Sequence, residues 1–121
     1  MTHVPTSYDQ DNVFARILRR EIPAQVVHED ELCLAFRDVA PQAPTHVLVV
    51  PKRPLARLVD AGPADEPILG HLLVTAAAVA RKLGFGDAFR IVVNNGREAG
   101  QTVFHLHVHV LAGRPFGWPP G

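Results

Sequence analysis

The chain has 121 residues, of which 47% are hydrophobic and 20% charged, values that fit one compact globular domain. Twelve basic residues balance twelve acidic ones, which argues against a nucleic-acid partner because such a surface must neutralise many phosphates. The single cysteine, Cys33, excludes an internal disulfide, and its apolar neighbours predict a buried thiol. No signal-peptide pattern opens the chain and no apolar run is long enough for a bilayer, so we expect a cytoplasmic protein without a membrane partner.

Residues 1–10 are polar and lack periodicity, which predicts a flexible tail before a single domain at residues 11–121. The segment 11–23 predicts a short helix that Asp11 or Asn12 can cap. Strands are expected at residues 24–30, 32–38 and 45–52, and a tight hairpin can join the first two.

The strongest helical signal spans residues 64–84, where apolar side chains recur at helical spacing and Gly84 follows as a natural C-cap. A short helical turn is expected within residues 54–60, and two more strands at residues 88–95 and 102–111. Strands that cluster before and after one long helix predict an α+β fold with a mostly antiparallel five-stranded sheet.

The last of these strands, "TVFHLHVHVL", has histidine at every second position: His105, His107 and His109. Alternation on a strand places these three imidazoles on one face, roughly 6.5 Å apart along the chain. Phe104, Leu106, Val108 and Val110 are then expected to face the core. Three successive histidines are unusual on a plain solvent-facing strand, so the pattern indicates a chemical function.

Two kinds of chemistry fit these histidines. Imidazole is a common zinc ligand, and His46 or Asp38 could supply a further ligand. Alternatively, a neutral imidazole can act as a nucleophile or acid on a phosphoryl group.

The preceding loop favours the phosphoryl interpretation. Its glycines allow the backbone to approach a ligand, and its amides and hydroxyl can donate to an anion. The residues concerned are Asn94, Asn95, Gly96, Gly100, Gln101 and Thr102. His46 opens a strand and is a further candidate, whereas His3, His28 and His71 have no supporting context and are predicted to be surface or structural residues.

The motif "HLHVHVL" resembles the His-x-His-x-His-x-x motif of the histidine triad (HIT) superfamily. The stretches "FARILRREIPAQVVHEDELCLAFRDVAPQAPTHVLVVPK" and "VVNNGREAGQTVFHLHVHVLAGR", with the terminal "WPPG", resemble its Hint branch, the purine nucleotide-binding phosphoramidases. The similarity covers about residues 12 to 121. It implies a HIT-like homodimer whose sheet continues across the interface. It also implies hydrolysis of the P–N bond of adenosine or guanosine 5′-phosphoramidates, with no cofactor or metal.

The resemblance also implies roles for individual residues. His107 would attack the α-phosphorus to form a nucleotidyl-histidine, His109 would hydrogen-bond the phosphoryl or leaving-group atoms, and His105 and His46 would support protonation and orientation. Asp38 would bind the ribose hydroxyls. The nucleobase, phosphate and partner-reaching positions expected for the nucleotide are Phe14, Ile17, Ile22, Phe36, Arg37, Val39, Asn94, Gly100, Gln101, Thr102, Val103 and Trp118.

Three positions depart from the pattern of many Hint relatives. Pro54 stands where a histidine is common, so a proton relay through that side chain is absent. Arg37 replaces a histidine beside the base-binding aromatic residue, which leaves the nucleobase preference open. Thr102 replaces a serine and keeps the hydroxyl. The alternative functions are dinucleoside polyphosphate hydrolysis, which the third histidine disfavours, and a nucleotide-binding or zinc-binding interaction module.

Overall fold

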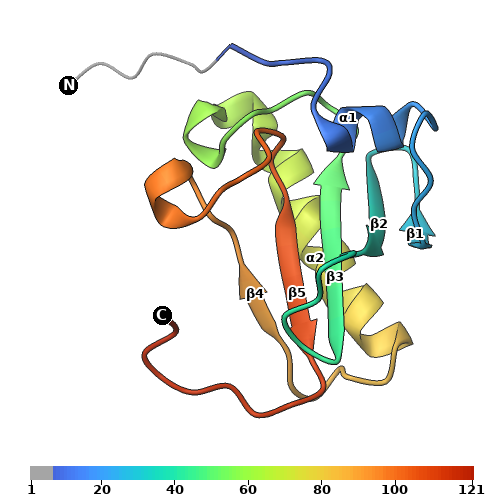
Figure 1. Cartoon of the computed structure of the whole chain (residues 1–121), viewed down its shortest axis with the longest axis vertical. Coiled ribbons are helices and arrows are strands. Elements are labelled where there is room, and N and C mark those ends of the chain that lie inside the picture. The colour runs from blue at the N-terminus through green and yellow to red at the C-terminus, as the bar shows by residue number, and fades with distance from the viewer. Residues whose placement is uncertain (1–6) are drawn as a thin grey trace.

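The computed structural model describes residues 7–121 and has the α+β architecture that the sequence predicts (Figure 1). Its helices and strands are α1 (Val13–Leu18), β1 (Val26–Glu29), β2 (Cys33–Arg37), β3 (Thr45–Pro51), α2 (Glu66–Lys82), β4 (Arg90–Val92) and β5 (Val108–Ala112). Short 3₁₀ turns lie at Leu58–Asp60, Pro63–Asp65 and Arg97–Ala99. The first of these turns lies within the segment where a helical turn was expected.

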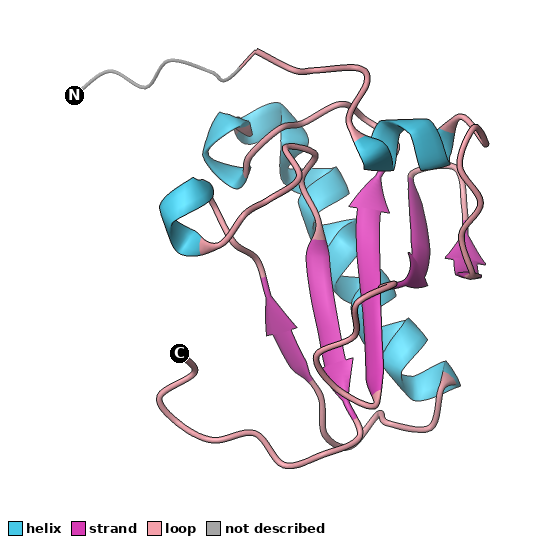
Figure 2. Ribbon diagram, viewed as in Figure 1, coloured by secondary structure: helices cyan, strands magenta, loops and turns pink. Residues whose placement is uncertain are grey.

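The five strands form one antiparallel sheet in the order β1-β2-β3-β5-β4. Figures 1 and 2 show the long helix α2 crossing behind this sheet. The β1–β2 hairpin is present, and β3 lies at the centre with all seven residues buried. This central strand brings residues before the long helix into contact with β5, which follows it.

Strand alternation divides the buried side chains into two clusters, one on each face of the sheet. Helix α2 packs on the first cluster, to which the strands contribute Cys33, Ala35, Val47, Val49, Val108 and Val110. The second cluster contains Phe14, Leu34, Phe36, Leu48 and Val50. Because Leu48 of β3 lies opposite His109 of β5, His109 belongs to the face that α1 covers.

Local chemistry accounts for both helices. Asn12 is the N-cap of α1, and its side chain accepts a hydrogen bond from the Ala15 backbone N–H. Helix α2 carries Pro67 in its first turn, where the missing N–H costs nothing. It ends before Gly84, whose φ of 92° is the positive value that favours glycine.

The histidine-rich segment is only partly a strand, which corrects the predicted strand at residues 102–111. Strand β5 begins at Val108, so His105 and His107 precede it. The backbone N–H of Leu106 donates to Leu55 O at 2.7 Å, a partner outside the sheet ladder, and this contact holds the segment off the strand path. Phe104 is half-buried and belongs to neither core cluster, contrary to its predicted core position.

The predicted tail is described only from Ser7 onward, and His3 lies outside the described residues. Ser7 to Gln10 form no helix or strand, but Tyr8 contacts the folded domain through His105. Among residues 7–121, no helix is long and apolar enough to cross a membrane.

Candidate active site

His107 lines a cavity, and one of its ring nitrogens already makes a hydrogen bond within the protein. Its Nδ1 is 2.7 Å from the backbone carbonyl oxygen of His105, which can only accept, so Nδ1 carries the proton. Burial lowers the pKa of His107, so the ring is neutral at pH 7. Its Nε2 therefore holds a free lone pair, the state that a nucleophilic imidazole requires.

A chain of hydrogen bonds determines which ring nitrogen of His109 carries the proton. The backbone N–H of Gln42 donates to Nδ1 of His46 at 3.0 Å, so the proton of this neutral ring is on Nε2. That Nε2–H points at Nδ1 of His109, 2.9 Å away. Burial lowers the pKa of His109 to about 4, so the neutral ring carries its proton on Nε2.

This Nε2–H of His109 is a buried donor with no protein acceptor among the described residues. An unpaired buried donor is costly, which is a reason to look for a ligand acceptor at this point. The rings of His107 and His109 lie 5.0 Å apart, and both line the same cavity. A lone pair on one ring and a donor on the other can therefore act on a single bound group.

His105 is fully buried and serves a different purpose from the other two. Its Nε2 donates to the carbonyl of Pro51 at 2.8 Å, and its Nδ1 accepts from the Tyr8 hydroxyl at 2.5 Å. Burial lowers the pKa of His105 to about 4. The ring is thus held neutral in one tautomer, and its own carbonyl orients His107.

Tyr8 was not predicted as a site residue, because the chain's only tyrosine lies in the segment predicted as a flexible tail. Nothing in its sequence neighbours marks it; only the contact with His105, 97 positions away, shows its role.

We expect Tyr8→Phe to lower the free energy of unfolding by about 1–3 kcal/mol, because it leaves the buried Nδ1 of His105 without a donor. Urea unfolding of the two proteins measures this difference. Tyr8→Leu is the comparison that also removes the edge-on contact between the two rings, and it should cost more. If Tyr8→Phe unfolds at the same urea concentration as the wild type, Tyr8 does not hold His105 in solution.

The cavity in front of His107 and His109 has a volume of about 350 Å³. Its wall is apolar on the side of α1, where the ring of Phe14 lies 4.9 Å from that of His107. Its polar rim includes Asp38, whose Oδ1 accepts from the Ala40 backbone N–H. The predicted nucleotide-binding residues that line this cavity are Phe14, Ile17, Ile22, Phe36, Arg37, Asp38, Val39, Thr102, Val103, His107 and His109.

The other predicted site residues are absent from the cavity wall. They are His46, His105, Asn94, Gly100, Gln101 and Trp118. His46 contacts His109, and the backbone carbonyl of His105 contacts His107. Trp118 is 83% exposed, on the C-terminal segment.

Gln101 stabilises the loop that precedes the histidines through hydrogen bonds of its side chain. Its side chain is buried, accepts from the Gly96 N–H at 2.8 Å and donates to the carbonyls of Ala56 and Val103. The predicted donor to an anion is thus already used by the protein. Gly96 and Gly100 have φ values of 92° and 100°, which favour glycine on either side of the 3₁₀ turn.

Backbone amides remain as the anion donors of this loop. Within residues 7–121, the N–H groups of Thr102 and Val103 donate to no protein acceptor, and both residues line the cavity. Consecutive free N–H groups can bind a phosphate without a cationic cluster.

Asp38, His46 and His109 also have ligand atoms within 4.8 Å of one another, a spacing that a metal ion could use. His46 would have to offer Nε2, because its Nδ1 accepts the Gln42 N–H. An ion on Nε2 would leave that ring with no proton on either nitrogen, whereas zinc ligands are ordinarily neutral imidazoles. These three residues therefore fit a zinc ion poorly. Their arrangement instead fits the hydrogen-bond chain that runs through His46 to His109.

Residues 19–116 match the sequence profile of the HIT domain. The chain belongs to the HIT domain family. The HIT motif histidines His105, His107 and His109 thus have the unequal surroundings described above.

Relatives and solved structures agree with this assignment. An uncharacterized HIT-like protein of Synechocystis sp. is 63% identical over 112 residues, 93% of this chain and 98% of its own length. The 14 kDa zinc-binding protein of Zea mays is 48% identical and covers 93% of this chain and 90% of its own. A HIT family hydrolase from Legionella pneumophila has a TM-score of 0.89 at 43% identity, covering 92% of this chain and 100% of its own.

Proposed function

We propose that this HIT protein is a hydrolase of the Hint branch, a purine nucleoside phosphoramidase that cleaves the P–N bond of adenosine or guanosine 5′-phosphoramidates. The observation that carries the proposal is the pairing of two neutral imidazoles at one cavity. His107 presents a lone pair there, and His109 presents a buried N–H without a partner.

The reaction follows from these proton positions. Nε2 of His107 attacks the α-phosphorus, the P–N bond breaks, and a nucleotidyl-histidine forms. His109 donates its Nε2 proton to the leaving nitrogen, which departs as an amine, and the water of the second step returns a proton to His109. Water then cleaves the nucleotidyl-histidine bond, releases the nucleoside monophosphate and restores His107.

The cavity offers separate surroundings for each part of a nucleotide. Apolar side chains such as Phe14, Ile17 and Phe36 suit a purine, and the Asp38 carboxylate can accept from ribose hydroxyls. The amides of Thr102 and Val103 can bind the phosphate. We further propose a homodimer, with exposed Trp118 reaching the partner and the sheet continuing across the interface.

The test compares leaving groups in the wild type and His109→Ala. Adenosine and guanosine phosphoramidates with an aromatic amine and with a more basic alkylamine are the substrates, beside diadenosine tetraphosphate. We expect the wild type to hydrolyse the phosphoramidates. His109→Ala should lose about 10–100-fold more kcat/KM with the alkylamine, whose departure depends more on the missing donor.

Equal losses for the two amines would contradict the role of His109. No hydrolysis of any phosphoramidate by the wild type would overturn the proposed function, and turnover of the diadenosine compound alone would favour polyphosphate hydrolysis. His28→Gln serves as a histidine control, because His28 does not line the cavity and glutamine keeps a donor to Asp30.

A further inference from the structure

We propose that His28, Asp30, Cys33 and His71 form a zinc site that joins the β1–β2 hairpin to helix α2. These residues lie on the α2 side of the sheet, where Cys33 and Ala35 face the helix. His109 lies on the opposite face. The proposal is therefore independent of the proposed function.

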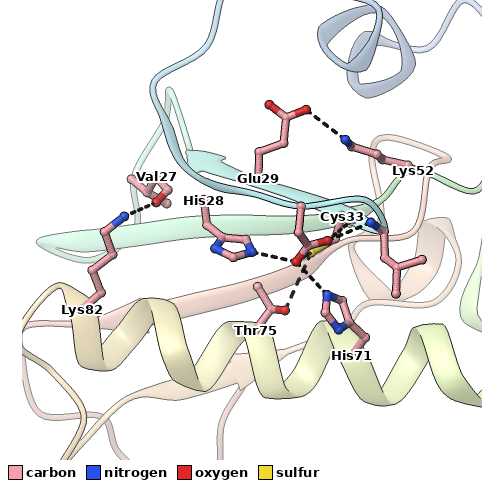
Figure 3. A network of polar contacts seen from close by, with 10 residues as sticks. Val27, His28, Glu29, Cys33, Lys52, His71, Thr75 and Lys82 are labelled. Carbon is pink, nitrogen blue, oxygen red and sulfur yellow. Dashed lines mark hydrogen bonds and ion pairs between the residues drawn. The ribbon is translucent and has the colours of Figure 1, made fainter.

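The four side chains come together at one carboxylate oxygen. Nε2 of His28 and Nε2 of His71 each lie 2.7 Å from Oδ2 of Asp30, and Sγ of Cys33 lies 3.5 Å from it. The ligand atoms of His28, Asp30 and Cys33 are all within 4.8 Å of one another. Figure 3 shows His28 reaching from the strand and His71 from the helix, with Cys33 between the two elements.

A β-bulge turns His28 toward the helix. Val26 pairs with Phe36, but the register then shifts and His28 pairs with Ala35. Without that shift, His28 would lie opposite Leu34, on the other face of the sheet. The bulge places both Val27 and His28 on the α2 side, and bulges commonly re-aim a side chain in this way.

The hairpin turn fixes the direction of the Asp30 carboxylate. Its Oδ1 accepts from the backbone N–H groups of Leu32 and Cys33 at 2.8 and 2.9 Å. This Asx turn leaves Oδ2 directed at the two imidazoles. Burial acts against ionisation, but hydrogen bonds from His28, His71 and the two backbone N–H groups outweigh it and lower the pKa of Asp30.

The proton positions suit a metal here, unlike those at His46. Each imidazole now donates its Nε2 proton to Asp30, and within residues 7–121 neither Nδ1 accepts a backbone N–H. Each ring can therefore move its proton to Nδ1 and offer Nε2 to an ion. The side chains of His28 and His71 are 34% and 33% exposed, so an ion can approach from solvent.

Cys33 is the fourth ligand of the proposed zinc site. Burial raises the pKa of this thiol to about 11, so it is protonated before metal binds. Zinc displaces that proton to the solvent, and the Zn–S bond forms. Two neutral imidazoles, one carboxylate and one thiolate then bind a divalent ion with no net charge, which suits a half-buried position.

Two distances must lengthen for this to occur. Ligands of a tetrahedral zinc ion lie about 3.3 Å apart, so the 2.7 Å hydrogen bonds to Asp30 must open by roughly 0.6 Å. Side-chain rotation of His71 and His28 provides this movement, because both side chains are partly exposed to solvent.

The test measures metal binding by untagged full-length protein. Zinc titration against a chromogenic chelator gives the affinity and stoichiometry, and Co²⁺ substitution gives the ligand spectrum. We expect one bound ion, a thiolate-to-cobalt charge-transfer band, and a rise in Tm of several degrees with zinc. The double variant His28→Gln/His71→Gln keeps donors to Asp30 and hence the fold, but should bind zinc at least ~100-fold more weakly.

The matched control is His46→Gln/His109→Gln, which removes the other histidine pair and should leave this ion bound. The proposal is overturned if the wild type binds no zinc, or if the His46/His109 variant loses the ion while the His28/His71 variant keeps it. A cobalt complex without the charge-transfer band, or one whose band persists in Cys33→Ser, also contradicts the four-ligand site.

Discussion

Replacing His107 with alanine is expected to lower kcat for an adenosine 5′-phosphoramidate by at least about 10,000-fold, the largest effect of any single change. The structure holds the Nε2 lone pair of His107 toward the cavity by tying Nδ1 to the His105 carbonyl. No neighbouring group can replace it, because His109 presents a proton there instead of a lone pair. Single-turnover kinetics with the wild type and variant measure the loss.

AMP binding by calorimetry is the control for this experiment. His107→Ala removes the reacting atom but leaves the apolar wall and Asp38 in place, so AMP affinity should change by less than about tenfold. In the wild type, an alkaline denaturing quench during turnover preserves the acid-labile P–N bond, and mass spectrometry should then find AMP attached to His107. A variant that keeps the wild-type kcat would remove His107 from the mechanism.

The second large effect is expected at Gln101, and on stability. Gln101→Met keeps the length of the side chain but removes hydrogen bonds to Gly96, Ala56 and Val103. Each unpaired buried backbone group costs about 1–3 kcal/mol, so we expect the free energy of unfolding to fall by ~3 kcal/mol or more. Equilibrium urea unfolding measures this, and KM for the phosphoramidate should rise as the Thr102 and Val103 amides lose their support.

Arg97→Ala is the matched control, because Arg97 lies in the same loop with its side chain exposed. It should change stability by less than about 0.5 kcal/mol. If Gln101→Met unfolds like the wild type but still raises KM, Gln101 contacts the nucleotide itself and the loop does not depend on it.

Most regular elements were predictable because their signals are local. The apolar spacing of α2, the Asn12 cap of α1 and the run of β-branched residues in β3 each act within a few positions. The order of these elements was enough to predict an antiparallel α+β sheet, which the structure confirms. The prediction fails at residues 102–107, where the alternating pattern of a strand is complete but the structure forms no strand.

That segment is not a strand because its partners are remote. Leu106 donates to Leu55, and Gln101 holds the carbonyls of Ala56 and Val103. Period-two alternation indicates which side chains could share a face, but a strand also needs a neighbouring strand to receive its hydrogen bonds. Only the tertiary structure shows that, among residues 7–121, no strand pairs with the segment that precedes Val108.

By itself, the sequence determined the fold class and the HIT motif, and it marked the three histidines as candidates for chemistry. The tertiary structure decided which nitrogen of each ring carries the proton, since this depends on Gln42, Pro51 and Tyr8, whose positions no local pattern relates to the motif. It also placed His28 and His71 on one carboxylate, through a register shift and a helix contact. Proton positions and ligand sets arise from contacts between distant residues, and the folded chain alone brings those residues together.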